Sequence, residues 1–263
     1  MPRRTQRYPL EGIVVLDLTR LLPGAYCTLI LADLGATVIK IEDVEGGDYM
    51  RWIPPLVKEL SIHFLSLNRN KKSMRLNLKT QRGKEIFRRL IRKSDVLVEG
   101  FRPGVMDRLG LGYTALKKIN PRLIFCSITG YGQEGPYRDK AGHDINYMGI
   151  CGALGSTGPT EGPPVLPSFQ LADVGGGSFA PAVAILTALY QRTKTQRGQR
   201  IDASMMEGAL SFMTMHFGAV LTGGKKFQRG RESLSGGAIC YSIYQTKDGR
   251  YMSLGALEPK FWK

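Results

Sequence analysis

Short apolar runs alternate with helical patterns in the first half of the chain. Residues 13–18 are a β-branched apolar run, which predicts a buried strand, and residues 37–42 are predicted as the next strand. Between them, Pro23-Gly24 precedes a predicted helix over residues 25–34, and Gly35 follows as its C-terminal stop. A strand, a helix and a strand in this order predict a βαβ unit with parallel strands and a right-handed crossover.

The alternation continues beyond this unit. Residues 82–93 carry apolar side chains at helical spacing among cations, which predicts an amphipathic helix. Residues 95–99 and 122–129 are predicted as the next two strands, with a short helix over 113–119 between them. This order predicts an α/β fold with a Rossmann-like open parallel sheet. Ligands of such sheets bind beyond the carboxyl ends of the strands, where residues 100–103 fall.

The pattern changes in the second half. Residues 182–191 and 205–221 predict two largely apolar helices, with a short strand over 200–203 between them. After a Gly-Gly-Lys-Lys linker, residues 241–244 and 250–254 are predicted strands on either side of an Asp-Gly turn. Such a turn between two β-type runs is typical of a hairpin.

Length and composition favour a globular protein. The chain has 263 residues, of which 43% are hydrophobic and 22% charged, so it has enough apolar material for a large core. We predict a large Rossmann-like domain over residues 1–222. Residues 223–263 are predicted to be a linker and the start of a smaller, incomplete α+β domain.

No targeting or membrane segment is expected. The basic N-terminus is followed by a short apolar run that Asp17 interrupts, so it does not resemble a signal peptide. No run of about 18 apolar residues is present, which argues against a membrane span. Cys27, Cys126, Cys151 and Cys240 are scattered without a CxxC pair or a Cys/His cluster. This favours buried thiols in a reducing compartment, hence the cytoplasm, and no metal site.

The formal net charge is +15. Such an excess suits a polyanionic ligand, either a nucleic acid or a cofactor with several phosphates. Basic runs such as residues 69–72 lack interleaved aromatic side chains, and no nucleic-acid-binding motif is present. The charge therefore favours a small molecule that carries phosphates, and nucleic acid is not expected as a partner.

Three stretches carry the candidate chemistry. His143, one of three histidines, sits in residues 141–147 beside a carboxylate, an amide and a phenol. Asp173 precedes three glycines at the start of an apolar helix, and Glu258 precedes Pro259 near the end of the chain. Histidine, aspartate and glutamate are the residue types of a proton-transfer site. We expect these three side chains to converge on one pocket.

Several roles are open at this point. Asp144 either orients the imidazole of His143 or caps a helix. Asp173 is either a helix N-cap or a functional carboxyl, and the glycines after it favour function, because a turn there would let the backbone approach a ligand closely. Backbone N–H groups at that helix start would stabilise a developing oxyanion. Asn146 and Tyr147 either hydrogen-bond a ligand or pack.

A set of motifs extends nearly from end to end. They are Asp33-Leu34-Gly35-Ala36 with residues 38–42, Gly100-Phe101-Arg102-Pro103-Gly104, residues 120–124, residues 141–147, Gly198-Gln199 and Glu258-Pro259. With these motifs the chain resembles the family III CoA-transferase (CaiB/BaiF) superfamily, and most closely its α-methylacyl-CoA racemase branch. Residues 142–147 are typical of the racemases, whereas the transferases have a sequence without histidine there.

The resemblance implies a fold and a reaction. It implies a Rossmann-like large domain, a small domain, and a homodimer whose subunits interlock as rings. The implied enzyme is an isomerase that inverts the carbon next to the thioester carbonyl of a 2-methylacyl-CoA. His143 would be the base on one face of that carbon, Asp173 the base on the other, and Glu258 a carboxylate near the site. Coenzyme A enters as part of the substrate, and no other cofactor is required.

The predicted contacts with the acyl-CoA form a larger set. Cations near strand ends suit the phosphates of CoA, and residues 76–79 match CoA-contacting positions of the relatives, as does Arg108. Lys71 and Arg75 are further cations of the same region. The predicted set is Arg69, Lys72, Leu76, Asn77, Lys79, Phe101, Arg102, Arg108, Gly142, Asp144, Asn146 and Tyr147.

Departures from the family pattern leave alternatives open. Asp43 stands where many relatives have an arginine for the CoA nucleotide, and Gly100 replaces a commoner asparagine. The family sequence continues beyond the point where this chain ends, so a fragment or split gene product is expected. One alternative is a family III CoA-transferase that forms an aspartyl-CoA intermediate at Asp173. The other is an inactive fragment that binds CoA.

Overall fold

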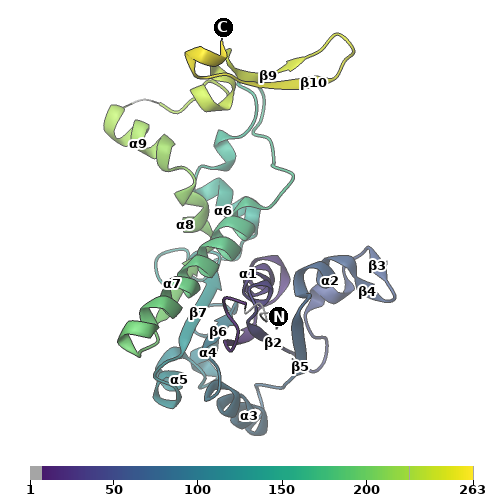
Figure 1. Ribbon diagram of the computed structural model, residues 1–263, viewed down its shortest axis with the longest axis vertical. Coiled ribbons are helices and arrows are strands. Elements are labelled where there is room, and N and C mark those ends of the chain that lie inside the picture. Colours follow the sequence, from purple (N-terminus) through teal and green to yellow (C-terminus); the bar gives the residue numbers. More distant parts are fainter. Residues whose placement is uncertain (1–7, 225, 263) are drawn as a thin grey trace, which may run out of the picture.

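The structure, a computed structural model, describes residues 8–224 and 226–262. Its centre is a six-stranded sheet in the order β5-β2-β1-β6-β7-β8, and every pair of neighbouring strands in it is parallel. This confirms the predicted open parallel α/β sheet (Figure 1). The strands are β1 (Val14–Leu18), β2 (Thr37–Glu42), β5 (Lys71–Arg75), β6 (Val96–Glu99), β7 (Ile124–Thr129) and β8 (Arg200–Ser204).

The inner strands are buried on both faces, as parallel sheets require. In β6, Val96 and Val98 belong to one hydrophobic core and Leu97 to the other, because successive side chains point to opposite faces. This explains why these strands read as continuous apolar runs. The edge strand β5 has the sequence Lys-Lys-Ser-Met-Arg and four of its five residues are exposed, so no apolar pattern predicts it.

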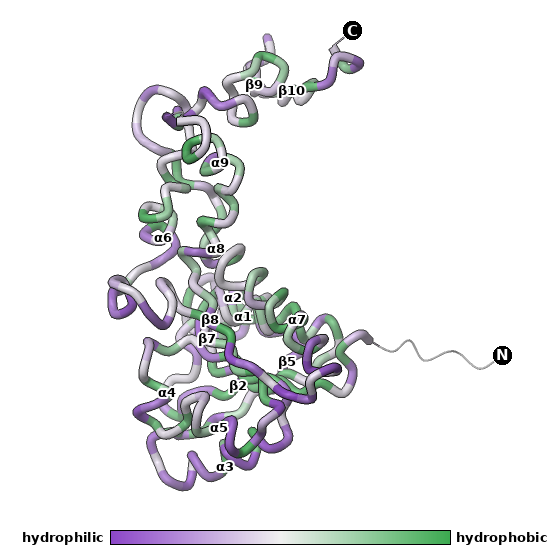
Figure 2. The backbone as a smooth tube through the Cα atoms, turned by 90° about the vertical axis from the view of Figure 1, so that its left-hand side faces the viewer, coloured by the Kyte–Doolittle hydropathy of each residue, from purple (hydrophilic) through white to green (hydrophobic). Residues whose placement is uncertain are grey.

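Helices cover both faces of the sheet. One core lies under α1, α7 and α8, and the other under α3, α4 and α5. The tube is largely hydrophobic along β7 and the first half of α7, and largely hydrophilic along α3 (Figure 2). The bounds are α1 (Leu21–Asp33), α3 (Gln81–Ile91), α4 (Val105–Arg108), α5 (Tyr113–Ile119), α7 (Ala180–Thr195) and α8 (Met205–Ser211).

The strand order reverses between β1 and β6. From β1 the chain runs outward through β2 to β5, returns to β6 on the other side of β1, and continues to β8. Leu18 at the end of β1 pairs with Glu99 at the end of β6. In open α/β sheets the ligand crevice lies at such a switch point, beyond the carboxyl ends of the two strands. Thr19 and Arg20 flank this crevice on one side, and Phe101 flanks it on the other.

Two predicted helices differ from the observed ones. Helix α1 begins at Leu21 and not at residue 25, and Pro23 lies in its first turn, where proline is tolerated. The predicted helix over residues 205–221 is two helices, α8 and α9 (Thr214–Gly223). The backbone N–H groups of Phe212 and Met213 bond three residues back, which tightens and ends α8.

A third helix is longer than predicted. Before α7 lies a π-helix (Ala172–Phe179) that is continuous with it, so one helical stretch runs from Ala172 to Thr195. Its length and mean hydropathy of 1.4 would suffice to cross a membrane, which the sequence pattern did not predict. However, 56% of its most apolar window is buried inside the protein, and Arg192 in it is buried and pairs with Asp95 at 2.8 Å. Core helices have these same properties.

The remaining elements lie around this body. The hairpin of β9 and β10 confirms the predicted Asp-Gly turn and lies at the opposite end of the long axis from α3 and α5 (Figure 1). The domain boundary at residue 222 stays a prediction. The elements outside the sheet and its covering helices are β3 (Leu56–Val57), β4 (Leu60–Ser61), α2 (Ile62–Asn68), α6 (Asp144–Ile150), β9 (Tyr241–Gln245), β10 (Tyr251–Gly255), and 3-10 turns at Tyr49–Trp52, Leu154–Ser156 and Pro259–Phe261.

Candidate active site

His143 is the N-cap residue of α6. Its backbone is extended, and its N–H donates to Oδ1 of Asn146 at 2.9 Å while its carbonyl oxygen accepts the N–H of Asn146 at 2.8 Å. Asn146 therefore closes the start of the helix onto the backbone of His143, in the manner of a capping residue. The residue itself is exposed. His143 is thus exposed to solvent, while its backbone is held in place by Asn146.

Tyr147 anchors α6 to the hydrophobic core. Its buried ring lies edge-on to Tyr131 with the centroids 5.1 Å apart, and its hydroxyl donates to the carbonyl oxygen of Gly142 at 2.5 Å. A Cβ atom on Gly142 would lie 2.6 Å from the Tyr147 ring and 2.7 Å from the Tyr131 hydroxyl. Only glycine fits at this position, so Gly142 and Tyr147 together fix the chain immediately before His143.

Asp144 joins this helix to the one that carries Asp173. Its Oδ1 accepts the N–H of Ala172 at 2.7 Å and the N–H of Asp173 at 3.0 Å. It therefore satisfies two of the N–H groups that the π-helix start leaves without intrahelical partners. Of the two roles left open for Asp144, the structure favours the cap, although the helix capped is not its own. The contact brings His143 and Asp173 to the same side of the molecule.

The pKa of Asp173 is raised to about 6. Burial is the main cause, and the negative charge of Asp144 adds to it, whereas His143 lowers the pKa of Asp173. His143 and Asp144 are adjacent in the chain, and Asp144 binds the backbone N–H of Asp173, so these three residues form one cluster. A carboxyl group with this pKa exchanges its proton readily near neutral pH, as a general acid or base must.

The three glycines after Asp173 do not form the open turn that the sequence suggests. They are buried inside the π-helix. An added Cβ would lie 2.3 Å from the Phe212 ring at Gly175, and 2.4 Å from the Met205 carbonyl oxygen at Gly176. The glycines therefore let α8 pack directly on the π-helix. The expected oxyanion site at this helix start is wrong, because Asp144 already occupies the first N–H groups.

Glu258 is not brought into the cluster. It is exposed, precedes the last short 3-10 turn, and follows β10 at the far end of the molecule. Among the described residues, no hydrogen bond or ion pair connects its side chain with His143 or Asp173. The described residues also contain no group of three or more His, Cys, Asp or Glu side chains that could hold a metal ion.

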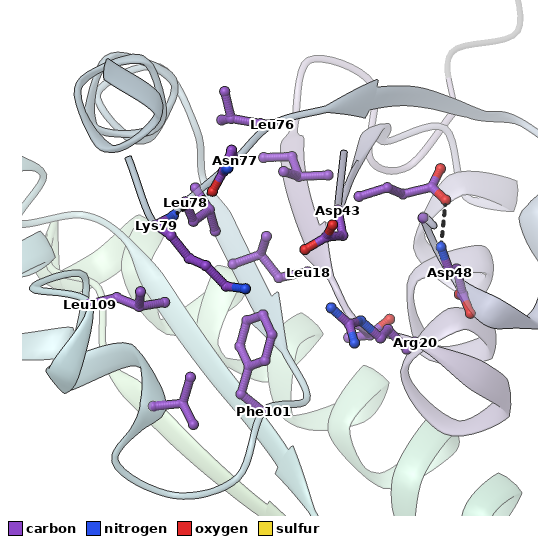
Figure 3. A pocket seen from close by; sticks show the side chains of 15 residues that line it. Leu18, Arg20, Asp43, Asp48, Leu76, Asn77, Leu78, Lys79, Phe101 and Leu109 are labelled. Carbon is purple, nitrogen blue, oxygen red and sulfur yellow. Dashed lines mark hydrogen bonds between the residues drawn. The ribbon is translucent and has the colours of Figure 1, made fainter. Parts of the chain in front are cut away.

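A second site lies at the switch point of the sheet. A cavity of ≈170 Å³ opens there, beyond the carboxyl ends of β1, β2, β5 and β6 (Figure 3). Four members of the predicted CoA-binding set line it, namely Leu76, Asn77, Lys79 and Phe101. The ammonium group of Lys79 and the ring of Phe101 face the same opening (Figure 3).

The other predicted cations lie elsewhere. Arg69 is paired with Asp33 on the surface, and Lys72 is exposed on β5. Arg102 lines a smaller cavity of ≈120 Å³ on the other side of the segment 100–104. The guanidinium of Arg108 lies beside Gly104, at 3.1 Å from the position of an added Cβ. Of the predicted cations, Lys79 lines the switch-point cavity, and these four lie outside it.

A buried ionic network surrounds Asp17 in β1. Lys71 Nζ lies 3.3 Å from Asp17 Oδ2 and also donates to the Ala25 carbonyl oxygen at 2.7 Å, so it is not available to a ligand. Burial opposes ionisation of Asp17, but the charges of Lys40 and Lys71 outweigh it and lower its pKa to about 2. A carboxylate inside an apolar strand is the sequence signal that could have revealed this network.

Sequence reasoning also missed Arg20 as a cavity residue. Asp43 directly follows β2 and Arg20 lies two residues after β1, and both line the cavity. Their position beyond the ends of two predicted adjacent strands was the available signal. The sequence marked Asp43 only as a departure from the family pattern, and not as a residue of the cavity.

Several known proteins resemble this chain in sequence. The family model described as "CoA-transferase family III" matches residues 10–263. The chain belongs to this family. A succinyl-CoA:glutarate CoA-transferase of Mus musculus is 43% identical over 249 residues, which cover 94% of this chain and 56% of that protein. An alpha-methylacyl-CoA racemase of Homo sapiens is 41% identical over 254 residues, which cover 97% of this chain and 63% of that protein.

Solved structures of the family agree with the fold. A CAIB/BAIF family protein from Brucella suis superposes with a TM-score of 0.85 at 36% identity, over 94% of this chain and 65% of that one. The chain therefore spans less than two thirds of the length of each of these relatives. The relatives carry the names of both racemases and transferases, so membership alone leaves the reaction undecided.

Proposed function

We propose that this CoA-transferase family III chain is an acyl-CoA racemase that interconverts (R)- and (S)-2-methylacyl-CoA thioesters. The observation that carries the proposal is the cluster of His143 and Asp173, held together by the Asp144 bonds to Ala172 and Asp173. Racemisation requires two proton-transfer groups near one carbon, and this cluster offers an imidazole and a carboxyl of raised pKa.

The reaction is a 1,1-proton transfer through an enolate. Neutral His143 takes the C2 proton from one face, the C2–H electron pair moves into the thioester to form the enolate, and Asp173 returns a proton to the other face. A positioned acid or base contributes about 10²–10⁴-fold to such a step. With a pKa of about 6, roughly a tenth of Asp173 is protonated at pH 7, and this fraction can act as the acid. In the reverse direction the two groups exchange roles.

The CoA part of the substrate is assigned to the switch-point cavity. Its position beyond the carboxyl ends of β1 and β6 is where open α/β sheets bind nucleotides. Lys79 at the opening and the net charge of +15 suit the phosphates. The proposed site needs coenzyme A only as part of the substrate. Arg102 and Arg108 follow Phe101 beyond the end of β6. Burial is the main cause that raises the pKa of Tyr147 to about 12, and the charge of Arg102 opposes this rise.

A CoA-transferase is the second candidate, favoured by the 43% identity with the succinyl-CoA:glutarate enzyme. In that reaction the Asp173 carboxylate attacks the acyl thioester and releases the CoA thiolate, which leaves a mixed anhydride. The thiolate then attacks the aspartyl carbonyl and expels the donor carboxylate, which leaves aspartyl-CoA. An acceptor carboxylate takes up the CoA by the reverse of these two steps, which frees the Asp173 carboxylate. This route uses Asp173 as a nucleophile and gives no role to a second base at His143, so the racemase accounts for more of the cluster.

The assembly proposed for the whole enzyme is an interlocked homodimer in the cytoplasm. Exposed apolar side chains near the C-terminal end support a further contact surface there: Leu221 is 80% exposed, Ile243 70% and Tyr251 71%. Sedimentation equilibrium of the chain tests the dimer, and a concentration-independent monomer would contradict it for residues 1–263.

Exchange of the C2 hydrogen with solvent deuterium tests the reaction. Each enantiomer of a 2-methylacyl-CoA is incubated separately in heavy water with the wild type, His143→Ala and Asp173→Asn. We expect the wild type to exchange both enantiomers, and each variant to lose at least 10²-fold in exchange of the enantiomer whose proton its missing group removes. Asp139→Asn, an exposed carboxylate outside the cluster, is the matched control.

The outcomes separate the candidates. Unchanged exchange in His143→Ala would contradict the racemase. Absence of exchange in the wild type, combined with transfer of CoA to a carboxylate acceptor and a hydroxylamine-trapped adduct at Asp173, would establish the transferase. Binding of CoA with neither reaction would leave the inactive CoA-binding fragment.

A further inference from the structure

Three charged side chains at the switch-point cavity have no ionic partner within the described part of the chain. Among the acids that line it, Glu42 is paired with Arg51 at 2.6 Å and Asp48 with Lys40 at 3.0 Å. Arg20, Asp43 and Lys79 form no ion pair within 4.0 Å among the described residues, although all three line the cavity. The close view shows them directed at a common opening (Figure 3). A ligand that completes this arrangement must offer both negative charge and a hydrogen-bond donor.

Asp43 presents one oxygen atom to that opening. Its Oδ1 accepts the N–H of Glu45 at 2.9 Å, which fixes the orientation of the carboxylate. Its Oδ2 takes part in no hydrogen bond among the described residues. A carboxylate accepts hydrogen bonds and donates none. The free oxygen is therefore a directed acceptor at the end of β2.

Arg20 and Phe101 form a platform beside this acceptor. The guanidinium carbon of Arg20 lies 6.0 Å from the centroid of the Phe101 ring, across the switch point between β1 and β6. Guanidinium planes and aromatic rings are the groups on which nucleobases stack. A flat heteroaromatic ring is thus the ligand part that suits this wall of the cavity.

Buried charges hold the backbone of Thr19, the residue before Arg20. Lys40 Nζ donates to the Thr19 carbonyl oxygen at 2.8 Å, and Asp17 Oδ1 accepts the N–H of Thr19 at 2.9 Å. The next residue, Leu21, has a φ of 59°, a left-handed conformation that a leucine adopts only when its surroundings impose it. Backbone strain of this kind clusters at ligand sites, and here it fixes the place of Arg20.

We propose that Asp43 recognises the 6-amino group of the adenine of coenzyme A, and that the Arg20–Phe101 platform holds the plane of the base. This inference rests on the proposed binding of CoA at the switch point and names the residue that reads the base. The amino group donates to Asp43 Oδ2, and Lys79 is left to face the phosphates. Asp43 is thereby a specificity-determining residue.

An amide at position 43 reverses the polarity of this contact. In Asp43→Asn, the amide oxygen keeps the bond from the Glu45 N–H, so the NH₂ group takes the place of Oδ2 and becomes a donor. The donor suits the 6-oxo group of hypoxanthine and leaves the 6-amino group of adenine without an acceptor. The variant retains the shape of the side chain, so a change of preference reports on hydrogen bonding.

The test compares two ligands by titration calorimetry on the purified chain: CoA, and its analogue with hypoxanthine in place of adenine. We expect the wild type to bind CoA about tenfold more tightly than the analogue, and Asp43→Asn to lose or reverse this preference. Arg20→Gln should weaken both ligands by a similar factor, because stacking does not read the 6-substituent. Glu45→Gln removes a charge from the same loop outside the cavity and should retain the wild-type preference.

The results distinguish this inference from the proposed function. If the wild type binds CoA and the analogue equally well and Asp43→Asn changes neither, Asp43 does not read the base, while CoA binding stands. If neither ligand binds the wild type, the proposed function itself fails, and this inference fails with it. A thermal melt of each variant checks that the fold is retained.

Discussion

Asp144 Oδ1 accepts the backbone N–H of Asp173 at 3.0 Å, so the residue after one proposed base holds the backbone of the other. The same oxygen accepts the N–H of Ala172 at 2.7 Å. Asp144 therefore acts on Asp173 in two ways: its oxygen caps the helix, and its charge raises the pKa of the Asp173 carboxyl. Two substitutions can separate these effects.

Asp144→Ala should destabilise the fold, whereas Asp144→Asn should not. The alanine variant leaves two partly buried N–H groups without an acceptor, which costs about 1–2 kcal/mol in the free energy of unfolding. The asparagine variant keeps an acceptor oxygen. Both variants remove the negative charge, so the pKa of Asp173 should fall below about 6 in each. Urea unfolding and carboxyl NMR titration measure the two quantities, and equal destabilisation by both variants would refute the capping role.

Asp173→Asn should stabilise the folded chain above pH 6. The pKa of Asp173 is raised by burial and by Asp144, so the folded state disfavours the ionised form. This unfavourable contribution is absent below the ordinary pKa of 3.8 and is complete once the pH has risen through about 6. Because the group is partly exposed, we expect a gain of only ~1 kcal/mol at pH 7.5. Unfolding free energies at pH 4 and 7.5 check this, and an equal gain at both values would count against an electrostatic origin.

Glu99→Gln offers a second pH-dependent test, at the end of β6. Burial is the main cause that raises the pKa of Glu99 to about 7, and Asp107 adds to it, whereas Ser127, the Phe101 N–H and Arg200 lower it. The folded state therefore favours protonated Glu99, and stability is lost as the pH rises through about 7. Glutamine keeps an acceptor for the Phe101 N–H, which Glu99 Oε2 now binds at 2.8 Å.

The expected gain of Glu99→Gln over the wild type is about 2 kcal/mol at pH 8.5 and close to zero at pH 4.5. Denaturant unfolding at both pH values measures it. Glu207→Gln, an exposed carboxylate on α8, is a control that should show no such dependence. A loss of stability at pH 8.5 would mean that ionised Glu99 is stabilised in the fold.

Gly176→Ala should unfold or strongly destabilise the chain. The added Cβ would lie 2.4 Å from the carbonyl oxygen of Met205, which is backbone and cannot rotate away. We expect a loss of at least ~2 kcal/mol because α8 must move off the π-helix. Gly218→Ala in α9 is the matched control, since nothing lies within 4 Å of its added Cβ. There alanine should raise stability by about 0.5–1 kcal/mol through its helix propensity. Thermal melts of both variants decide this.

The sequence determined the elements whose pattern is local. The strands β1, β2, β6 and β7 are largely apolar because both faces of a parallel sheet are buried, and the Asp-Gly turn predicts the hairpin of β9 and β10. Residue types alone also singled out His143 and Asp173, since few histidines occur and neither side chain suits an apolar surrounding. These inferences need no knowledge of what lies across the fold.

Tertiary structure decided everything that depends on a distant neighbour. The edge strand β5 has no apolar pattern, because pairing with β2 requires only its backbone. The glycines at 175–177 suggest a turn, yet Met205 and Phe212 show that they serve close helix packing. The oxygen of Asp144 finds its partners 28 and 29 residues away, and Arg20 meets Phe101 only because β1 and β6 are adjacent in the sheet. Local sequence specifies torsion preferences and burial, whereas the partner of a polar side chain is set by which segments the fold places beside it.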